Sequence, residues 1–257
     1  MWEKRSHLPW RRTTEPYKIL VSEIMLQQTQ VDRVVPFYNK FIKKFPTAKK
    51  LAAAKLPSVL KTWQGLGYNR RAKYLHDAAK VIAREGFTGQ RLPGVGPYTR
   101  GAVLAFAFNK PEVFIETNIR TVIFYHSNIL QNTRMTDLEL LPVVEKLLKK
   151  SKMQPREFYT ALMDYGAHLK KQGVKLNTQS KHYTKQSKFE GSARQLRGAI
   201  LRELLKKPAT LGQLTLRLSS GQAKKFSPRT RGEVECELLR LKKDGLVSGG
   251  PAYRIAR

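Results

Sequence analysis

Two glutamates stand in sequence surroundings that would give their carboxyl groups different chemistry. Glu23 lies inside the apolar helical stretch Val21–Leu26, where burial would raise its pKa and keep a proton available for general acid catalysis. Glu116 follows an apolar run and precedes Thr117 and Asn118, so it stands where a helix is expected to begin. Cleavage of a glycosidic bond requires one carboxyl group that protonates the leaving group and another that stabilises positive charge on the sugar. Each glutamate also has a purely structural interpretation, a locally hydrogen-bonded side chain for Glu23 and a helix cap for Glu116.

A glycine hairpin precedes the second glutamate. The run Leu92–Ala102 places two glycines around one apolar residue, directly before a helical segment. Glycine is required where the backbone must approach a phosphodiester closely, and the N-terminus of the following helix adds partial positive charge. We therefore expect Gly94 and Gly96 to hold nucleic-acid phosphates, and we assign the same contact to Thr99 and Asn118. Taken alone, two such glycines are also typical of an ordinary turn.

The chain is strongly basic. Its 257 residues include 49 Lys plus Arg and 19 Asp plus Glu, a formal net charge of +30, which favours a polyanionic partner and above all nucleic acid. A merely basic surface and a structural protein of ribosomal type are the alternatives. No apolar run is long enough to span a bilayer and no signal-peptide pattern is present, so we expect a cytoplasmic, nucleoid-associated chain with no membrane partner. The single cysteine, Cys236, excludes an internal disulfide and a cysteine-ligated metal cluster.

Apolar residues recur at helical spacing along most of the chain, which predicts an all-α main domain. The region Tyr17–Phe45 is expected to be helical with a break at Pro36. No segment before the C-terminal end alternates as a strand would. The same helical period predicts further helices over Ala48–Leu60, Ala72–Glu85, Tyr98–Phe108, Asn118–Leu130, Asp137–Leu148 and Arg156–Lys170.

The C-terminal part of the sequence has a different pattern. Apolar content falls between Lys170 and Lys188, which predicts a basic linker or arm over residues 171–190, between a main domain over 1–170 and a small basic domain over 191–257. A winged-helix-like domain is expected there, because three short helical patterns precede a hairpin. These elements are Ala193–Lys207, Leu211–Leu218, Arg231–Asp244 and the hairpin Leu246–Ile255.

Cations at the start of the third helix of this small domain would suit a recognition helix. The run Ser227–Arg231 carries two arginines where such a helix meets phosphates or bases. A small accessory domain with a solvated basic face is the alternative.

Five motifs, in this order, resemble those of the MutY-like adenine DNA glycosylases in the helix-hairpin-helix superfamily. The resemblance covers about residues 8–170. It implies a two-lobed α-helical fold that bends DNA, flips a base into a pocket between the lobes and hydrolyses its N-glycosidic bond. The motifs are Leu8–Arg11, Ser22–Val31, Gly65–Tyr68, the hairpin Leu92–Ala102 and Ala161–Ala167.

The resemblance also implies roles for single residues. Glu23 matches the acid that protonates the base, and Glu116 stands where the family has the aspartate that stabilises the sugar cation. Glutamate keeps the charge but adds a methylene group, which shifts the carboxylate relative to the sugar. Gln28 and Tyr68 match the residues that fill the gap left by the flipped base and wedge the duplex open. Core packing is the alternative for Tyr68.

Four further positions bear on the base pocket and on the reaction. Trp10 and Arg11 match residues that line the pocket in the family, although Trp10 could equally anchor the N-terminal segment. Tyr98 stands where bifunctional relatives such as endonuclease III carry a lysine. Without that amine no Schiff base forms, so a monofunctional glycosylase with no or weak AP lyase activity is expected. Thr160 stands where adenine glycosylases carry a Glu or Gln that reads the base.

The chain departs from the family in two more respects. The family's iron–sulfur cluster would follow Ala167, yet no cysteine lies there and Lys170, Lys171 and Lys175 occupy the region. Because these cysteines are missing, we expect no iron–sulfur cluster and no other metal or cofactor, and we expect the basic arm to supply DNA contacts instead. The C-terminal domain shows no sign of the Nudix-like module that recognises 8-oxoguanine in the family.

Three functions remain open from the sequence. Removal of adenine opposite 8-oxoguanine or guanine is favoured by Glu23 and the run Gln27–Thr29. Removal of thymine or uracil opposite guanine is the second, and a DNA-binding protein that lost activity through the Asp-to-Glu change at position 116 is the third. In each case the expected partner is double-stranded DNA with a mispaired or damaged base, bound by a monomer.

Overall fold

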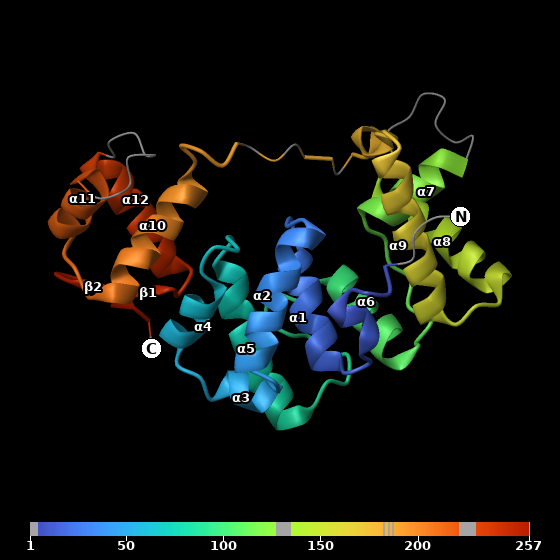
Figure 1. Ribbon diagram of the computed structural model, residues 1–257, viewed down its shortest axis with the longest axis horizontal. Helices are drawn as coiled ribbons and strands as arrows, with labels where there is room; N and C mark the ends of the chain where they lie inside the picture. The colour runs from blue at the N-terminus through green and yellow to red at the C-terminus, as the bar shows by residue number, and fades with distance from the viewer. Residues whose placement is uncertain are drawn as a thin grey trace. The chain divides into compact units, whose positions relative to one another are not determined.

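The computed structural model describes residues 5–126, 135–181, 183, 184, 186, 188–220 and 230–256 (Figure 1). These residues are mainly helical and include one two-stranded antiparallel sheet, so the all-α prediction is confirmed. Two compact units share the chain: unit 1 comprises residues 1–27, 87–91 and 95–185, and unit 2 comprises residues 28–86, 92–94 and 186–257. The sequence-based boundaries at residues 170 and 190 stay a prediction.

Unit 1 is built around a buried helix. Every residue of α1 from Ile19 to Met25 is buried, which is the pattern of a core helix rather than a surface helix. Helix α1 packs against α6, and α9 packs along α7 (Figure 1). The elements of unit 1 are η1 (Pro9–Arg12), α1 (Pro16–Leu26), α6 (Pro97–Phe108), α7 (Thr117–His126), α8 (Asp137–Ser151), α9 (Pro155–Lys171) and η3 (Leu176–Gln179).

Helices α7 and α9 approach each other closely at Gly166. A Cβ atom at this position would lie 2.2 Å from the backbone oxygen of Asn118, so the approach requires glycine. Nearby, the rings of Phe114 and Tyr159 stack with centroids 3.9 Å apart, and the Tyr159 hydroxyl donates a 2.7 Å hydrogen bond to the carbonyl of Glu112. These contacts fix the segment that leads into α7.

One arginine ties the N-terminal segment to unit 1. The Arg156 guanidinium donates hydrogen bonds to the backbone carbonyls of Phe106, Arg11 and Thr13 at 2.8–2.9 Å. Because three separate carbonyls converge on one side chain of α9, the short helix η1 is held in a defined place.

Unit 2 begins with four helices, α2 (Val31–Lys44), α3 (Ala48–Ala52), α4 (Leu56–Trp63) and α5 (Arg70–Glu85). Helix α5 packs against α3 and α4. Their common core contains Phe41, Leu51, Trp63 and Leu75, all fully buried. Gly94 also belongs to this unit and has a φ of +71°, and a Cβ there would lie 2.5 Å from Cβ of Tyr74. The hairpin glycine is therefore required by its own backbone and packing.

The C-terminal part of unit 2 contains α10 (Ala193–Lys206), α11 (Leu211–Ser220), α12 (Arg231–Lys243), β1 (Val247–Gly249) and β2 (Tyr253–Ile255). The strands form an antiparallel hairpin in which Val247 lies opposite Ile255. A capping box between Thr230 and Glu233 starts α12. Three helices followed by a hairpin match the winged-helix outline expected from the sequence.

Two details of the predicted helices are wrong. Pro36 does not break the helix but lies inside α2. Val34, Tyr38 and Phe41, on the two sides of it, share one buried face. Burial of this face compensates for the backbone hydrogen bond that proline cannot make. The predicted helix Ala48–Leu60 is two helices, with α3 ending at Ala52 and α4 starting beside Pro57.

Part of two other predictions falls outside the described residues. Helix α7 is described only as far as His126, so the stretch to Leu130 predicted as its continuation is not covered. The same holds for Ser227, Pro228 and Arg229 of the basic run before α12.

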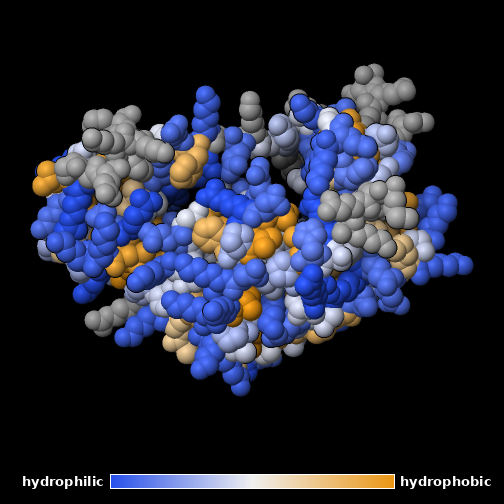
Figure 2. Space-filling model, in the orientation of Figure 1, coloured by the Kyte–Doolittle hydropathy of each residue, from blue (hydrophilic) through white to orange (hydrophobic). Residues whose placement is uncertain are grey.

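Hydrophilic side chains cover most of the face shown in Figure 2. This agrees with a chain of 49 basic and 19 acidic residues. Within the described ranges, no helix has the length and apolar character needed to cross a bilayer.

Candidate active site

Glu23 is a buried carboxyl group on α1. Only 6% of the residue is exposed, since α1 is surrounded by other elements of unit 1. The pKa of Glu23 is raised to about 7, mainly by burial and to a smaller extent by the nearby charge of Glu116. A hydrogen bond from Tyr98 and the charge of Arg11 act in the opposite direction. A group with a pKa about 7 is both protonated often enough and acidic enough to donate a proton at neutral pH.

Tyr98 stands in the first turn of α6, which places its hydroxyl against Glu23. The hydroxyl donates a 2.8 Å hydrogen bond to Oε2 of Glu23, and the ring packs edge-on against Phe114 with centroids 5.7 Å apart. Burial and the neighbouring carboxylates hold the pKa of Tyr98 well above its usual value, so the phenol stays a donor. At the position where bifunctional relatives are expected to carry an amine, this chain has a hydroxyl that orients the acid.

Arg11 enters the same part of unit 1 from η1. Its Nη2 lies 3.3 Å from Oδ1 of Asp164 on α9, and its guanidinium carbon lies 5.7 Å from the centre of the Phe106 ring. Nη1 of Arg11 is buried and has no acceptor within the part of the chain that the structure describes. A buried donor without a partner is costly, so this atom is suited to an acceptor on a bound ligand.

Trp10, the neighbour of Arg11, is only 7% exposed. Its packing fits the structural interpretation as an anchor of the N-terminal segment, and its predicted role in the base pocket stays a prediction. Thr160 lies on α9 and is half-buried, so it shares unit 1 with Glu23. Its predicted role in reading the base also stays a prediction.

Glu116 is the N-cap of α7. Oε1 accepts hydrogen bonds from the backbone amides of Asn118 at 2.7 Å and Ile119 at 2.9 Å, and Oε2 accepts from the Thr117 hydroxyl and the Asn118 amide side chain. The capping interpretation is therefore confirmed. It does not conflict with a catalytic role, because the same hydrogen bonds hold the carboxyl group in a fixed place.

Lys170 was not predicted as part of this cluster. Its Nζ donates a 2.8 Å hydrogen bond to Oδ1 of Asn118, whose Nδ2 donates to Glu116. Burial lowers the pKa of Lys170, and the charge of Glu116 raises it. The sequence shows Lys170 only as one cation in a basic run, and nothing in its spacing connects it with Glu116, 54 residues earlier.

The residues predicted to bind phosphate have different surroundings. Thr99 is 2% exposed, and its hydroxyl accepts a 3.3 Å hydrogen bond from Gln27, so its side chain has an internal partner. The side chain of Asn118 is used by Glu116 and Lys170. Gly96 is exposed at the start of α6, with open space where a Cβ would lie. The phosphate contacts stay predictions, most easily met by the exposed backbone at Gly94 and Gly96.

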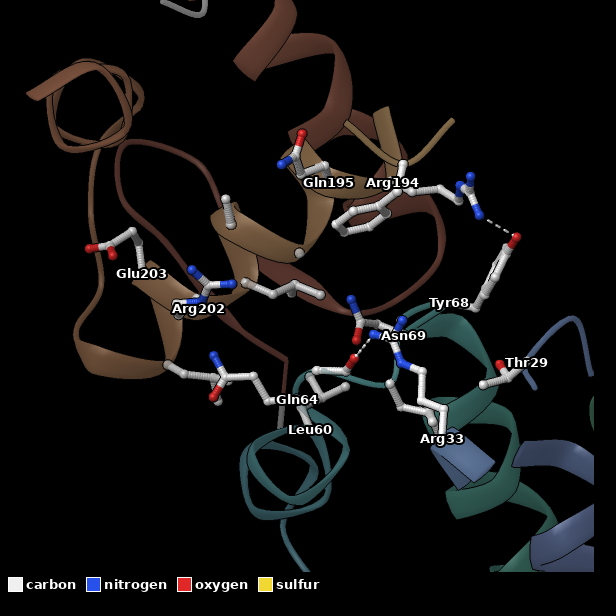
Figure 3. Close-up of a pocket in the computed structure, with 18 of the residues that line it drawn as sticks. Thr29, Arg33, Leu60, Gln64, Tyr68, Asn69, Arg194, Gln195, Arg202 and Glu203 are labelled. Carbon is white, nitrogen blue, oxygen red and sulfur yellow. Dashed lines mark hydrogen bonds between the residues drawn. The ribbon is translucent and has the colours of Figure 1, made fainter. Parts of the chain in front are cut away.

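The two predicted wedge residues belong to unit 2, and both have strained backbones. Gln28 has a φ of +56° and Tyr68 a φ of +49°, a region that side-chain-bearing residues avoid unless the surroundings impose it. The Tyr68 hydroxyl accepts a 2.6 Å hydrogen bond from Nη1 of Arg194 and another from Gln186, and Arg71 lies over its ring at 5.1 Å. Tyr68 is half-buried at the wall of a pocket (Figure 3). Its wedge role and its packing alternative both stay predictions.

Comparison with known proteins connects this geometry to a family. The model of the HhH-GPD superfamily base excision DNA repair proteins matches residues 21–156, which include Glu23, Tyr68, Tyr98 and Glu116. The chain is 41% identical over 174 residues to the adenine DNA glycosylase of Mycolicibacterium smegmatis, covering 63% of this chain and 58% of that protein. It is 34% identical over 184 residues to human adenine DNA glycosylase, covering 64% and 33%.

Two solved structures are also similar. A thermostable thymine-DNA glycosylase shares 31% sequence identity with a TM-score of 0.53, covering 62% of this chain and 77% of that one. A 3-methyladenine DNA glycosylase from H. pylori shares 16% identity with a TM-score of 0.50, covering 65% and 89%, which is a likeness of fold. The chain spans about half the length of several curated adenine glycosylases that it matches. Since the family model covers more than half of this chain and includes both candidate catalytic glutamates, the chain belongs to the HhH-GPD superfamily of base excision DNA repair proteins.

Proposed function

We propose that this protein is a monofunctional DNA glycosylase that removes adenine mispaired with 8-oxoguanine or guanine. The observation that carries the proposal is Glu23, a buried acid with a pKa about 7 that shares unit 1 with the helix cap Glu116. Adenine is favoured because several adenine DNA glycosylases are 33–43% identical to this chain over 133–175 residues.

In the proposed reaction Glu23 gives its proton to a ring nitrogen of the extruded base. The N-glycosidic bond then breaks, its electron pair leaves with the base, and the sugar becomes cationic. Glu116 stabilises that cation, since its carboxylate is held in place by the amides of Asn118 and Ile119. Water adds to the sugar and loses a proton, which leaves an abasic site.

Two side chains of unit 1 would orient this chemistry. Tyr98 fixes the direction of the Glu23 carboxyl group through the 2.8 Å hydrogen bond. Arg11 offers the unsatisfied donor Nη1 to an acceptor on the base. Because Tyr98 is a phenol and not an amine, it cannot form a Schiff base with the sugar, which supports hydrolysis without strand cleavage.

A second candidate is removal of thymine or uracil opposite guanine. The likeness to the thermostable thymine-DNA glycosylase favours it, since 77% of that chain is covered at 31% identity. Thr160 also leaves the base-reading position without the Glu or Gln expected of an adenine glycosylase.

Single-turnover excision tests both candidates directly. The full chain is incubated with duplexes carrying adenine opposite 8-oxoguanine, adenine opposite guanine, thymine opposite guanine or uracil opposite guanine, and alkali then cleaves the abasic sites. Product confined to the adenine strands supports the first candidate, and product from thymine or uracil supports the second. Product in none of the four contradicts both. Borohydride trapping on the same duplexes should give no covalent complex if the enzyme is monofunctional.

A further inference from the structure

Unit 2 contains a pocket that the proposed reaction does not use. It has a volume of about 1020 Å³, at the upper end of the ~300–1,000 Å³ typical of ligand sites. One wall is helix α10, with Arg194, Gln195 and Arg202, and the other is formed by α4, the following loop and the start of α2, with Leu60, Gln64 and Arg33 (Figure 3). A pocket of this size and shape accommodates an extended ligand rather than one small ion.

The pocket is electropositive. Of the described residues that line it, five are cations and one is a carboxylate: Arg33, Arg194, Arg202, Lys206 and Arg217 against Glu203. Lys206 and Glu203 form an ion pair of 2.7 Å with each other. Arg33, Arg202 and Arg217 then have no carboxylate partner among the described lining residues, and arginine is the side chain best matched to phosphate oxygens.

Arg217 shows most clearly that the pocket lacks an anion. Its Nη1 is buried, yet no described residue accepts a hydrogen bond from it. A buried guanidinium nitrogen without an acceptor carries a desolvation cost. A ligand oxygen at this point would remove that cost.

The neutral polar lining fits a nucleotide chain. The amide side chains of Gln28, Gln64, Asn69 and Gln195 line the pocket together with the ring of Tyr68. Amides can hydrogen-bond sugars and base edges, and an aromatic ring can stack on a base. Tyr68 is also one of the two predicted wedge residues, and its hydroxyl accepts a hydrogen bond from Arg194 of α10. The pocket therefore adjoins the predicted wedge.

We propose that this pocket, the α10 pocket, binds the sugar–phosphate backbone of a DNA strand beside Tyr68, with Arg202 and Arg217 as phosphate ligands. The inference rests on the proposed function for its partner, DNA. It gives the winged-helix-like part of the chain a role, since α10 and α11 supply Arg194, Arg202 and Arg217.

The test compares two charge-matched double variants. In the pocket pair, Arg202→Gln and Arg217→Gln remove two cations from the α10 pocket. In the control pair, Lys242→Gln and Lys243→Gln remove two exposed cations of α12, which do not line it. Fluorescence anisotropy with a lesion-containing duplex gives the Kd at several salt concentrations, and thermal melting checks that each variant is folded. Since Arg217 is half-buried, the exposed Arg202→Gln single variant provides a second measurement.

Loss of two phosphate contacts should lower the slope of log Kd against log salt by about 2 and weaken binding roughly tenfold at moderate salt. The control pair should change the slope by less than half as much, because salt screens charges distant from the bound strand. Equal effects in both pairs would overturn the proposal. So would equally strong displacement of the duplex by a free deoxynucleoside monophosphate, which would make the pocket a mononucleotide site.

The outcome is independent of catalysis. The excision panel reports on Glu23 and Glu116, whereas the salt slope reports on the α10 pocket. If the wild-type chain excises no base and the salt slope falls only in the pocket pair, the result would contradict the proposed function and support this inference. If the wild-type chain excises adenine and both double variants have the same salt slope, the result would support the proposed function and contradict this inference.

Discussion

The hydroxyl of Tyr98 donates a 2.8 Å hydrogen bond to the buried carboxyl group of Glu23. The two residues lie 75 positions apart in the sequence, on helices α6 and α1. The contact gives the proposed acid a fixed direction and opposes the rise in its pKa that burial causes. It also uses the position where a bifunctional relative would present its amine. The direction and the pKa of the proposed acid therefore depend in part on this one side chain.

Replacement of Glu23 by Gln should abolish excision while DNA binding persists. Gln occupies the same space but has no proton to donate, and loss of a general acid costs about 10²–10⁴ in rate. Single-turnover rates and anisotropy measure the two properties separately. Glu157→Gln, an exposed carboxylate in the first turn of α9, is the matched control and should excise at the wild-type rate. Excision by Glu23→Gln at a similar rate would remove Glu23 from the mechanism.

The excision rate should fall as the pH rises through about 7, the pKa of Glu23, because only the protonated form donates. Tyr98→Phe removes a hydrogen bond that favours the charged carboxylate, so it should raise this pKa and move the fall to higher pH. A pH profile of the single-turnover rate for both proteins provides the measurement. An inflection that stays in place or moves to lower pH in Tyr98→Phe would show that the hydrogen bond does not tune the acid.

The same buried carboxyl group should make stability depend on pH. The folded protein holds its proton up to a pKa about 7, whereas the unfolded chain releases it near 4.5, so wild-type stability should fall as the pH rises from 4.5 to 7. Glu23→Gln lacks this titration. The difference between its free energy of unfolding and that of wild type should therefore increase by about 3 kcal/mol from about pH 4.5 to pH 8. Urea unfolding of both proteins at the two pH values tests this, and a constant difference would contradict it.

Glu116 should be replaceable by Asp but not by Ala. Aspartate is a good N-cap and carries the same charge, so Glu116→Asp should keep both helix α7 and excision. Glu116→Ala leaves the amides of Asn118 and Ile119 uncapped, at a cost of about 1 kcal/mol in stability, and should slow excision by at least about 10². Thermal melting and single-turnover rates separate the two effects. Unchanged excision in the Ala variant would limit Glu116 to its capping role.

The ring of Tyr68, and not its hydroxyl, should matter for opening the duplex. A base–aromatic contact is worth about 1–3 kcal/mol, so Tyr68→Ala should slow excision by roughly 10- to 100-fold. Tyr68→Phe keeps the ring and loses only the hydrogen bonds from Arg194 and Gln186. Fluorescence of 2-aminopurine placed beside the target base reports duplex opening in each variant. Equal losses in Ala and Phe would assign the role to the hydroxyl.

Several features of this protein could be predicted from its sequence because they depend on local pattern. Helical spacing of apolar residues predicts nearly every helix within a few positions, and the same pattern indicates that Glu23 lies on a core helix. Glu116 is predicted at a helix start because apolar, acidic and cap residues follow one another there. The division of Ala48–Leu60 into two helices was one exception. Pro36 was the other, since its local effect on the backbone is overcome by burial on both sides.

Which side chains meet depends on the tertiary structure and not on local pattern. The pairs Tyr98 with Glu23, Lys170 with Asn118 and Arg194 with Tyr68 join residues 52 to 126 positions apart, and no periodicity relates them. The sequence indicates which face of a helix is apolar but not which helix covers it. The pKa of Glu23 and the unsatisfied nitrogen of Arg217 depend on that covering, because desolvation and hydrogen bonding are properties of the packed interior and not of the segment alone.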